Sequence, residues 1–405
     1  MRYWFKLFLF LLLSASCAKN EYVTYRDQTP KTEEHHNPEL IAKTIYSHFY
    51  DKDTKGADLL PLSSNTLRDS LATVVNFQDN GFVIYLNNGK NTPLVVCEQG
   101  QYPGDSKDNL SMSIISSILD TAEEMRSPRS FPDPSESTIF EDITRRDSLI
   151  VSPLIEVLWH QTDPFTLYTP NNYIAGCVPV AIAQAMSVFS YPASIDLTYP
   201  GANMSSCTLD WINMKAYIHS IAFMGIFHDS QSCTYCHQCG QLLRQLGELC
   251  DVVYGPTSSS TSLHNFTSVL SSLGYTSSYT NSFSTNTVVS SLQSGYPVIL
   301  NGANDGSCHA YNVDGCKQYE EASTIYVYEG GSWHIDSYNY TSWTYLHCCY
   351  GLQVGLFNGY YASQNIFQTI PENGIPVIVN TDELQGPDWN LVHAMNYNIH
   401  PISQL

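Results

Sequence analysis

Apolar positions between residues 39 and 125 change between helical and strand spacing. Leu40, Ile41, Ile45 and Phe49 recur at the three- and four-residue intervals of one helical face. Two apolar runs between 66 and 100 are typical of strands, and the second contains "NNGKN", which has the composition of a hairpin turn. Helical spacing returns in "LSMSIISSILDTAEEM". The pattern therefore predicts a small α+β domain over residues 39–125.

The chain from 148 to 405 shows helical patterns first and strand patterns afterwards. Helical spacing follows Cys177 and recurs in three later segments, at 240–253, 263–275 and 286–295. Strand-like segments then occupy 296–304, 308–319, 323–336, 344–354 and 358–363. Helices followed by strands predict a second α+β domain with an antiparallel sheet. No fixed-period repeat is visible in the sequence.

Two polar segments separate these regions from each other and from the beginning of the chain. Residues 18–38 are charged and contain Pro, which predicts a flexible tether. Residues 126–147 are rich in Pro, Ser and charge, which predicts an exposed linker and a region for proteolytic processing. A plain linker without processing is the alternative, and the pair Arg145–Arg146 does not decide between the two.

The first seventeen residues have the pattern of a signal peptide. Arg2 and Lys6 precede an apolar stretch that is too short to span a bilayer. Small residues then lead to Cys17, as in a bacterial lipoprotein signal, so we expect Cys17 to be lipidated. Ordinary cleavage near Ser16 is the alternative. We therefore expect the protein to be anchored by this lipid in the membrane of a bacterial cell envelope or at the cell surface. Secretion without an anchor is the alternative.

Charge and cysteine content bear on nucleic-acid binding, disulfides and metal sites. The net charge is −20, from 18 basic and 38 acidic residues, and no basic block is present, which excludes most nucleic-acid binding. Export permits disulfides among the 12 cysteines, although spacing does not reveal the pairing. Four cysteines have the spacing C-x2-C-x2-C-x10-C, which suits disulfides or a structural metal: Cys233, Cys236, Cys239 and Cys250. Export argues against a labile cluster; we predict disulfides, with a structural metal as the alternative, and no cofactor.

One cysteine stands at the beginning of a predicted helix. After Cys177, an apolar face with helical spacing predicts a buried helix. Pro179 is tolerated only in the first helical turn, which places Cys177 at the N-terminus. Backbone N–H groups at a helix N-terminus favour a thiolate. Cys177 is therefore a candidate nucleophile, although an inert buried cysteine or half of a disulfide is the commoner case for a cysteine taken at random.

A nucleophilic cysteine needs a base and a donor for the oxyanion. His309 enters an alternating strand 132 residues after Cys177, which fits the Cys-to-His spacing of papain-like enzymes. Gln161 lies 16 residues before Cys177, and its amide is a candidate oxyanion donor. Strand alternation places Asp314 on the face opposite His309, so we predict a structural role for Asp314.

A series of segments carries a resemblance to a known family. They are "LWHQTDPF", "AGCVPVAIAQAMSVFSYP", "LDWINM", "LLRQLGELCDVVYGPTSSST", "YPVILNG", "CHAYNVDGC" and "NGYY". In these segments the chain resembles the streptopain (C10) family of cysteine peptidases, over about 150 to 400. Residues 39–125 resemble the family's propeptide, notably in "GFVIYLNNGKNTPLVVCEQGQY".

The resemblance implies a fold, an activity and roles for the candidates. It implies a papain-like fold, preceded by a propeptide that blocks the active site and is removed by cleavage. Cys177 would be the nucleophile, His309 the general base, and Gln161 an oxyanion donor beside the Cys177 backbone N–H. The expected partners are protein or peptide substrates and the chain's own propeptide. The expected function is an exported cysteine endopeptidase made as a zymogen.

The sequence departs from the family at the support of the histidine. The family has His-x-Asn-Trp-Gly-Trp where this chain has "HCCYGL", so Cys349 occupies the position that orients the histidine. Tyr350 replaces the tryptophan that covers the catalytic pair. A thiol holds an imidazole tautomer less well than an amide does. A catalytically impaired protein that binds peptides or a protease partner is therefore the alternative function.

Overall fold

The computed structural model describes most of the chain from residue 37 onward. The described ranges are 37–50, 59–78, 81–88, 91–104, 110–124, 139–216, 230–304, 307–329, 332–352, 355–370, 377–378 and 392–402. The predicted signal peptide 1–17, with Cys17, and nearly all of the predicted tether 18–38 lie outside these residues. Within them, no helix is both long and apolar enough to cross a membrane.

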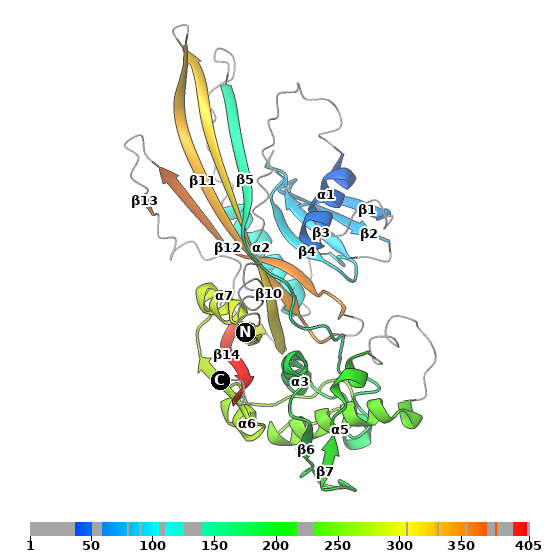
Figure 1. The fold of residues 1–405 in the computed structure, drawn as a ribbon. Helices are drawn as coiled ribbons and strands as arrows, with labels where there is room; N and C mark the ends of the chain where they lie inside the picture. Colours follow the sequence, from blue (N-terminus) through cyan, green and yellow to red (C-terminus); the bar gives the residue numbers. More distant parts are fainter. Residues whose placement is uncertain are drawn as a thin grey trace, which may run out of the picture.

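A single twisted antiparallel sheet of twelve strands runs through the described part of the molecule (Figure 1). The order is β1 (Pro61–Leu67), β2 (Ala72–Phe77), β3 (Phe82–Leu86), β4 (Pro93–Cys97), β12 (Gly359–Ile370), β11 (Ser332–Cys349), β10 (Ser307–Glu329), β9 (Val298–Asn304), β14 (Val392–Pro401) and β8 (Tyr275–Thr280). Off this path, β13 (Val377–Ile378) pairs with β12 and β5 (Ile139–Val151) pairs with β10. A separate two-stranded sheet consists of β6 (Ser194–Asp196) and β7 (Ser206–Thr208).

Most of the helices pack against different parts of this sheet. Helix α1 (Pro38–Tyr50) contacts strands β1 to β4, whereas α2 (Leu110–Glu124) contacts β9 and β10. The other helices are α3 (Cys177–Phe189), α5 (Thr234–Leu249), α6 (Thr267–Ser272) and α7 (Thr285–Gln293), with short 3₁₀ turns at Pro170–Asn172 and Ser230–Ser232. Helices combined with antiparallel strands agree with the α+β class predicted from the sequence.

Residues 37–124, here called the first unit, share their sheet and their hydrophobic core with the rest of the chain. Strand β4 pairs with β12 from Cys97 opposite Gly359 to Val95 opposite Tyr361. Phe49 of α1 packs edge-on against Tyr345 of β11, with ring centroids 4.9 Å apart. Strand pairing and apolar packing therefore connect the residues before the boundary predicted near 125 with the residues after it.

The predicted linker 126–147 ends earlier than its composition suggests. Residues 126–138 lie outside the described residues, and β5 begins at Ile139 and pairs with β10 as far as Val151. Arg145 and Arg146 stand opposite Glu321 and Glu320 in this register. The polar composition of 139–147 was therefore misleading, because these residues pair with a strand that lies far along the chain.

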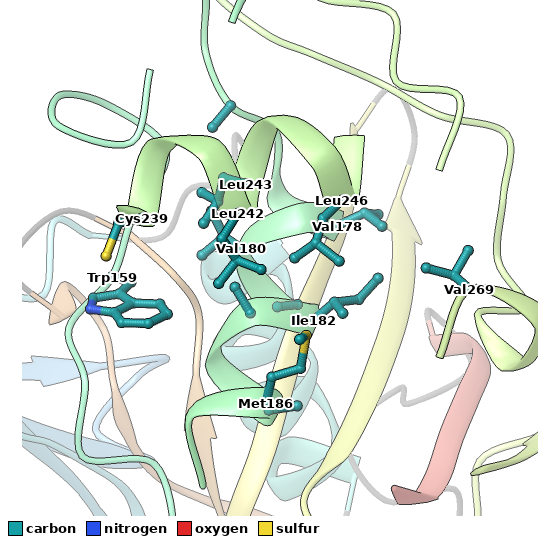
Figure 2. Close-up of a cluster of buried hydrophobic side chains, with 14 of the residues drawn as sticks. Trp159, Val178, Val180, Ile182, Met186, Cys239, Leu242, Leu243, Leu246 and Val269 are labelled. Atoms are coloured by element: carbon teal, nitrogen blue, oxygen red, sulfur yellow. The ribbon is translucent and has the colours of Figure 1, made fainter. Parts of the chain in front are cut away.

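Helix α3 lies inside a hydrophobic core that it shares with α5 and the sheet (Figure 2). Its residues from Val178 to Ser187 are buried on every side of the helix, as expected for a helix enclosed between two layers. One side packs on Leu242, Leu243 and Leu246 of α5, and the other side meets the sheet near Ala310. This packing fixes the start of α3 relative to strand β10.

Candidate active site

Cys177 is the first residue of α3, as the sequence predicts. Gly176 caps the helix with φ 94°, a left-handed conformation that favours glycine, and Pro179 lies in the first turn. The Cys177 thiol is half-buried and accepts hydrogen bonds from the backbone N–H groups of Cys177 itself and Ala310. The N-terminus of a buried helix and the adjacent strand thus both present N–H groups to the sulfur.

His309 lies on β10 opposite Gly302 of β9, with its ring within hydrogen-bonding reach of the Cys177 thiol. The Nε2 atom is 2.7 Å from the Tyr350 carbonyl oxygen. A carbonyl can only accept, so Nε2 carries the proton and donates, which leaves Nδ1 to face the thiol. The fold therefore brings together two residues that are 132 positions apart in sequence.

The pKa values of the two groups move toward each other. Burial alone would raise the pKa of the Cys177 thiol, but the hydrogen bond and positive charge of His309, with the two backbone N–H groups, hold it below its ordinary value. Burial alone would lower the pKa of His309, but Cys177 and the Tyr350 carbonyl hold it above its ordinary value. Both shifts favour a thiolate–imidazolium pair.

Gln161 lies on the segment that runs beside the residues preceding Cys177. Its backbone carbonyl accepts a hydrogen bond from the Ala175 N–H at 3.0 Å, and its side chain is partly exposed. Ala175 is two residues before Cys177, so the structure brings Gln161 to the entrance of α3. Gln161 is not among the residues that line the pocket described next.

A pocket opens beside Cys177 and His309. Its walls are mainly apolar, from Pro179, Val252, Leu263 and Ala310, with the hydroxyl groups of residues 259–261 on one side. The Ser259 hydroxyl accepts a hydrogen bond from the Gly255 N–H and donates one to the Ile174 carbonyl. This serine ties the wall of the pocket to the segment that leads into Cys177, and sequence analysis did not single it out.

A second thiol faces the same pocket. Cys308 is exposed and lines it beside His309. Any experiment on Cys177 must therefore control for the Cys308 thiol.

The two departures from the family have different surroundings. The Cys349 thiol is buried, accepts a hydrogen bond from Asn358 Nδ2 at 3.4 Å and contacts Gln184 and the Gly351 N–H. Tyr350 is buried, and its ring centroid is 6.3 Å from that of His309. The His309 ring thus has a backbone acceptor at residue 350, which a comparison of side chains alone could not reveal.

Asp314 lies away from His309, as strand alternation predicts. It is fully buried and accepts hydrogen bonds from His347 Nδ1 at 2.7 Å and from the Ile155 N–H at 2.9 Å. These bonds connect β10, β11 and the segment that leads to Gln161.

The four spaced cysteines do not form one cluster. The Cys233 thiol caps α5 and accepts a hydrogen bond from the Cys236 N–H at 3.1 Å, whereas Cys250 follows the last residue of the same helix. Among the residues that the structure describes, no three His, Cys, Asp or Glu side chains are grouped as metal ligands.

Comparison with protein families decides the classification. The model of the peptidase C10 family matches residues 159–361. The chain belongs to the peptidase C10 family. The match covers Gln161, Cys177, His309, Cys349 and Tyr350, and it confirms the resemblance to streptopain-like peptidases. No match to this chain is found among curated proteins. Membership makes the chain a cysteine-type peptidase in general terms.

Proposed function

We propose that this protein is a cysteine endopeptidase in which Cys177 is the nucleophile and His309 is the general acid and base. The observation that carries the proposal is the His309 ring, held between the Cys177 thiol and the Tyr350 carbonyl. A nucleophile at a helix N-terminus, with a base fixed by a third group, is the arrangement that covalent catalysis requires.

In this mechanism the Cys177 thiolate attacks the carbonyl carbon of the scissile peptide bond. The backbone N–H of Cys177 and the Gln161 amide donate to the oxyanion of the tetrahedral intermediate. The intermediate collapses as protonated His309 gives its proton to the leaving amine, and a thioester to Cys177 remains. A water molecule then loses a proton to His309 and attacks the thioester, which releases the carboxylic acid product and restores Cys177.

The arrangement of the two sides of the pocket supports a papain-like fold. Cys177 comes from the helical layer formed by α3 and α5, and His309 comes from the antiparallel sheet. A cleft between a helical side and a sheet side suits a peptide substrate, and the apolar pocket wall would accommodate an apolar side chain.

We further propose that the first unit is a propeptide and that processing occurs in the linker. Residues 139–151 are paired with β10, and a protease needs a segment that is free of strand partners. We therefore expect cleavage before Ile139 rather than at Arg145–Arg146. We also propose, from the sequence alone, that the protein is exported and either lipidated at Cys17 or secreted.

The alternative is an impaired relative that binds peptides in the same cleft, which the loss of the orienting asparagine at Cys349 suggests. The Tyr350 carbonyl argues for the enzyme, because it supplies an acceptor for the His309 Nε2–H without that side chain.

The experiment compares the purified chain with Cys177→Ala and Cys308→Ala variants. Mass spectrometry follows processing between 125 and 150, and a thiol-directed peptidyl probe reports a reactive cysteine. We expect processing and labelling in the wild type and in Cys308→Ala, and neither in Cys177→Ala. Cys308→Ala is the matched control because both thiols line one pocket.

A wild-type chain that neither processes nor reacts at Cys177, even after the linker is cut by an added protease, would contradict the peptidase proposal. Processing that persists in Cys177→Ala would assign the cleavage to another enzyme.

A further inference from the structure

Asn358 holds the backbone N–H of Tyr350, the residue whose carbonyl receives the His309 hydrogen bond. Asn358 is the residue immediately before β12, and its side chain is buried. The amide oxygen accepts a hydrogen bond from the Tyr350 N–H at 2.9 Å, and the amide nitrogen donates to the Cys349 thiol at 3.4 Å. One side chain therefore binds both residues at the end of β11, including the residue whose carbonyl faces His309.

The backbone of Asn358 is itself held on two sides. Its N–H donates to the Gly355 carbonyl at 2.9 Å, and its carbonyl accepts from the Glu98 N–H of the first unit at 3.0 Å. Gly355 has φ 70°, and a Cβ added there would lie 3.2 Å from the Asn358 amide nitrogen. The turn thus places the amide with little freedom to rotate or shift.

The position of the Tyr350 carbonyl decides how well His309 is oriented. A carbonyl that accepts from Nε2–H fixes the tautomer and stabilises the imidazolium, and small displacements in such contacts weaken catalysis strongly. The Cys349 thiol, by contrast, faces Asn358, Gln184 and a backbone N–H. Asn358 therefore contacts the residue whose backbone now orients His309.

We propose that Asn358 is a positioning residue for His309 and acts through the backbone of Tyr350. The proposal deepens the proposed function, because orientation of His309 matters for catalysis only if His309 is the base. It assigns to a turn after β11 the task that the family gives to a side chain on β11.

The titratable groups around the His309 ring are few among the described residues. Cys177 faces it from α3, and the phenols of Tyr311 and Tyr350 lie beside it, with ring centroids 6.3 Å away in each case. Cys308, the preceding residue of β10, and His264 line the same pocket. Burial raises the pKa of both phenols well above their ordinary value, so they stay neutral while His309 and Cys177 titrate. The alkaline limb of the activity profile then reports His309.

The test compares Asn358→Ala and Asn358→Asp with the wild type. We expect Asn358→Ala to lower kcat roughly tenfold with little change in KM, and to move the alkaline limb to lower pH. Asn358→Asp keeps an oxygen for the Tyr350 N–H, so it should recover most of the lost kcat.

The matched control is Asn76→Ala. Asn76 is also buried, accepts from a backbone N–H, that of Tyr102, at 2.8 Å and donates to Ser63, but it lies in the first unit. We expect Asn76→Ala to change stability and leave the alkaline limb in place. If Asn358→Ala behaves like Asn76→Ala, the positioning role is wrong.

A readout that needs no activity separates this proposal from the proposed function. In a Cys177→Ala background, the ring of His309 is titrated by NMR with and without Asn358→Ala. We expect the Asn358→Ala change to lower the pKa of His309 even if the wild-type chain proves inactive. An unchanged titration would overturn the role of Asn358, while an inactive wild type with a shifted titration would overturn only the peptidase proposal.

Discussion

The Cys177 side and the His309 side of the pocket are built in different ways. Cys177 begins a helix whose supporting residues follow it in the sequence, from Pro179 to Ser187. His309 lies on a strand, and the group that orients it comes from the end of β11 and is held by a turn before β12. The first side depends mainly on residues close in sequence, together with α5 and the Ala310 N–H, whereas the second depends on backbone contacts between distant segments.

On the proposed mechanism, this difference would allow a thiol to replace the family's orienting side chain. A helix N-terminus depends on the residues that build it, and position 176, with φ 94°, favours glycine. A backbone carbonyl is present whatever the side chain, so the sheet side can change residue 349 and keep an acceptor at residue 350. Substitutions at Cys349 should therefore matter less than their alignment with a catalytic position suggests.

The largest effect is expected for His309→Ala. Removal of the base should lower kcat/KM about 10³-fold or more and raise the pKa of the Cys177 thiol, because its positively charged partner is lost. Peptide hydrolysis and the pH dependence of alkylation measure the two effects. A variant that retains activity within tenfold would show that His309 is not the base.

The next effect is expected for Gln161→Ala, on the helical side. Loss of an oxyanion donor should lower kcat roughly 10²-fold with KM little changed. Gln161→Glu, which keeps the size but loses the amide donor, should match it. An equal rise in KM with unchanged kcat would instead assign Gln161 to substrate binding.

Asp314→Ala tests whether a buried ion pair in the sheet affects folding stability without affecting catalysis. Removing one partner of the buried pair with His347 should lower the free energy of unfolding by about 3 kcal/mol. Burial alone would lower the pKa of His347, but Asp314 holds it above its ordinary value. The contribution of the pair is therefore full at pH below the unfolded pKa and declines as pH rises through the folded pKa.

Chemical denaturation at several pH values measures this prediction. The wild type should lose stability as pH rises through that range, and Asp314→Ala should lose the slope. Below its melting temperature the variant should keep the pH profile of peptide hydrolysis, and a shifted alkaline limb would connect Asp314 to His309.

The smallest effect is expected for Cys349→Ala. Its thiol contacts Asn358 and Gln184, so peptide hydrolysis should change less than about threefold, equivalent to under about 0.7 kcal/mol. A loss of tenfold or more would restore the view that residue 349 orients the histidine. Cys316→Ala, another buried cysteine on the sheet, controls for loss of packing.

Particular residues show what the sequence could predict. The helix at Cys177 and the strand at His309 were accessible because helical and alternating spacing leave local signals. The Tyr350 carbonyl as partner of His309 could not be predicted, because a backbone carbonyl has no signature in residue type. The contact of Asn358 with the Tyr350 N–H was missed for the same reason, since its partner is also a backbone group. The strand at 139–151 was also missed, because Pro, Ser and charge upstream extended the predicted linker over residues whose partner, β10, lies far along the chain.

The most direct test of the Cys177–His309 pair is the pH dependence of Cys177 alkylation, measured by mass spectrometry in a Cys308→Ala background. We expect alkylation that persists below the ordinary pKa of a cysteine thiol and moves to higher pH in His309→Ala. Alkylation of Cys177 that follows an ordinary thiol titration, unchanged by His309→Ala, would contradict the proposed pair.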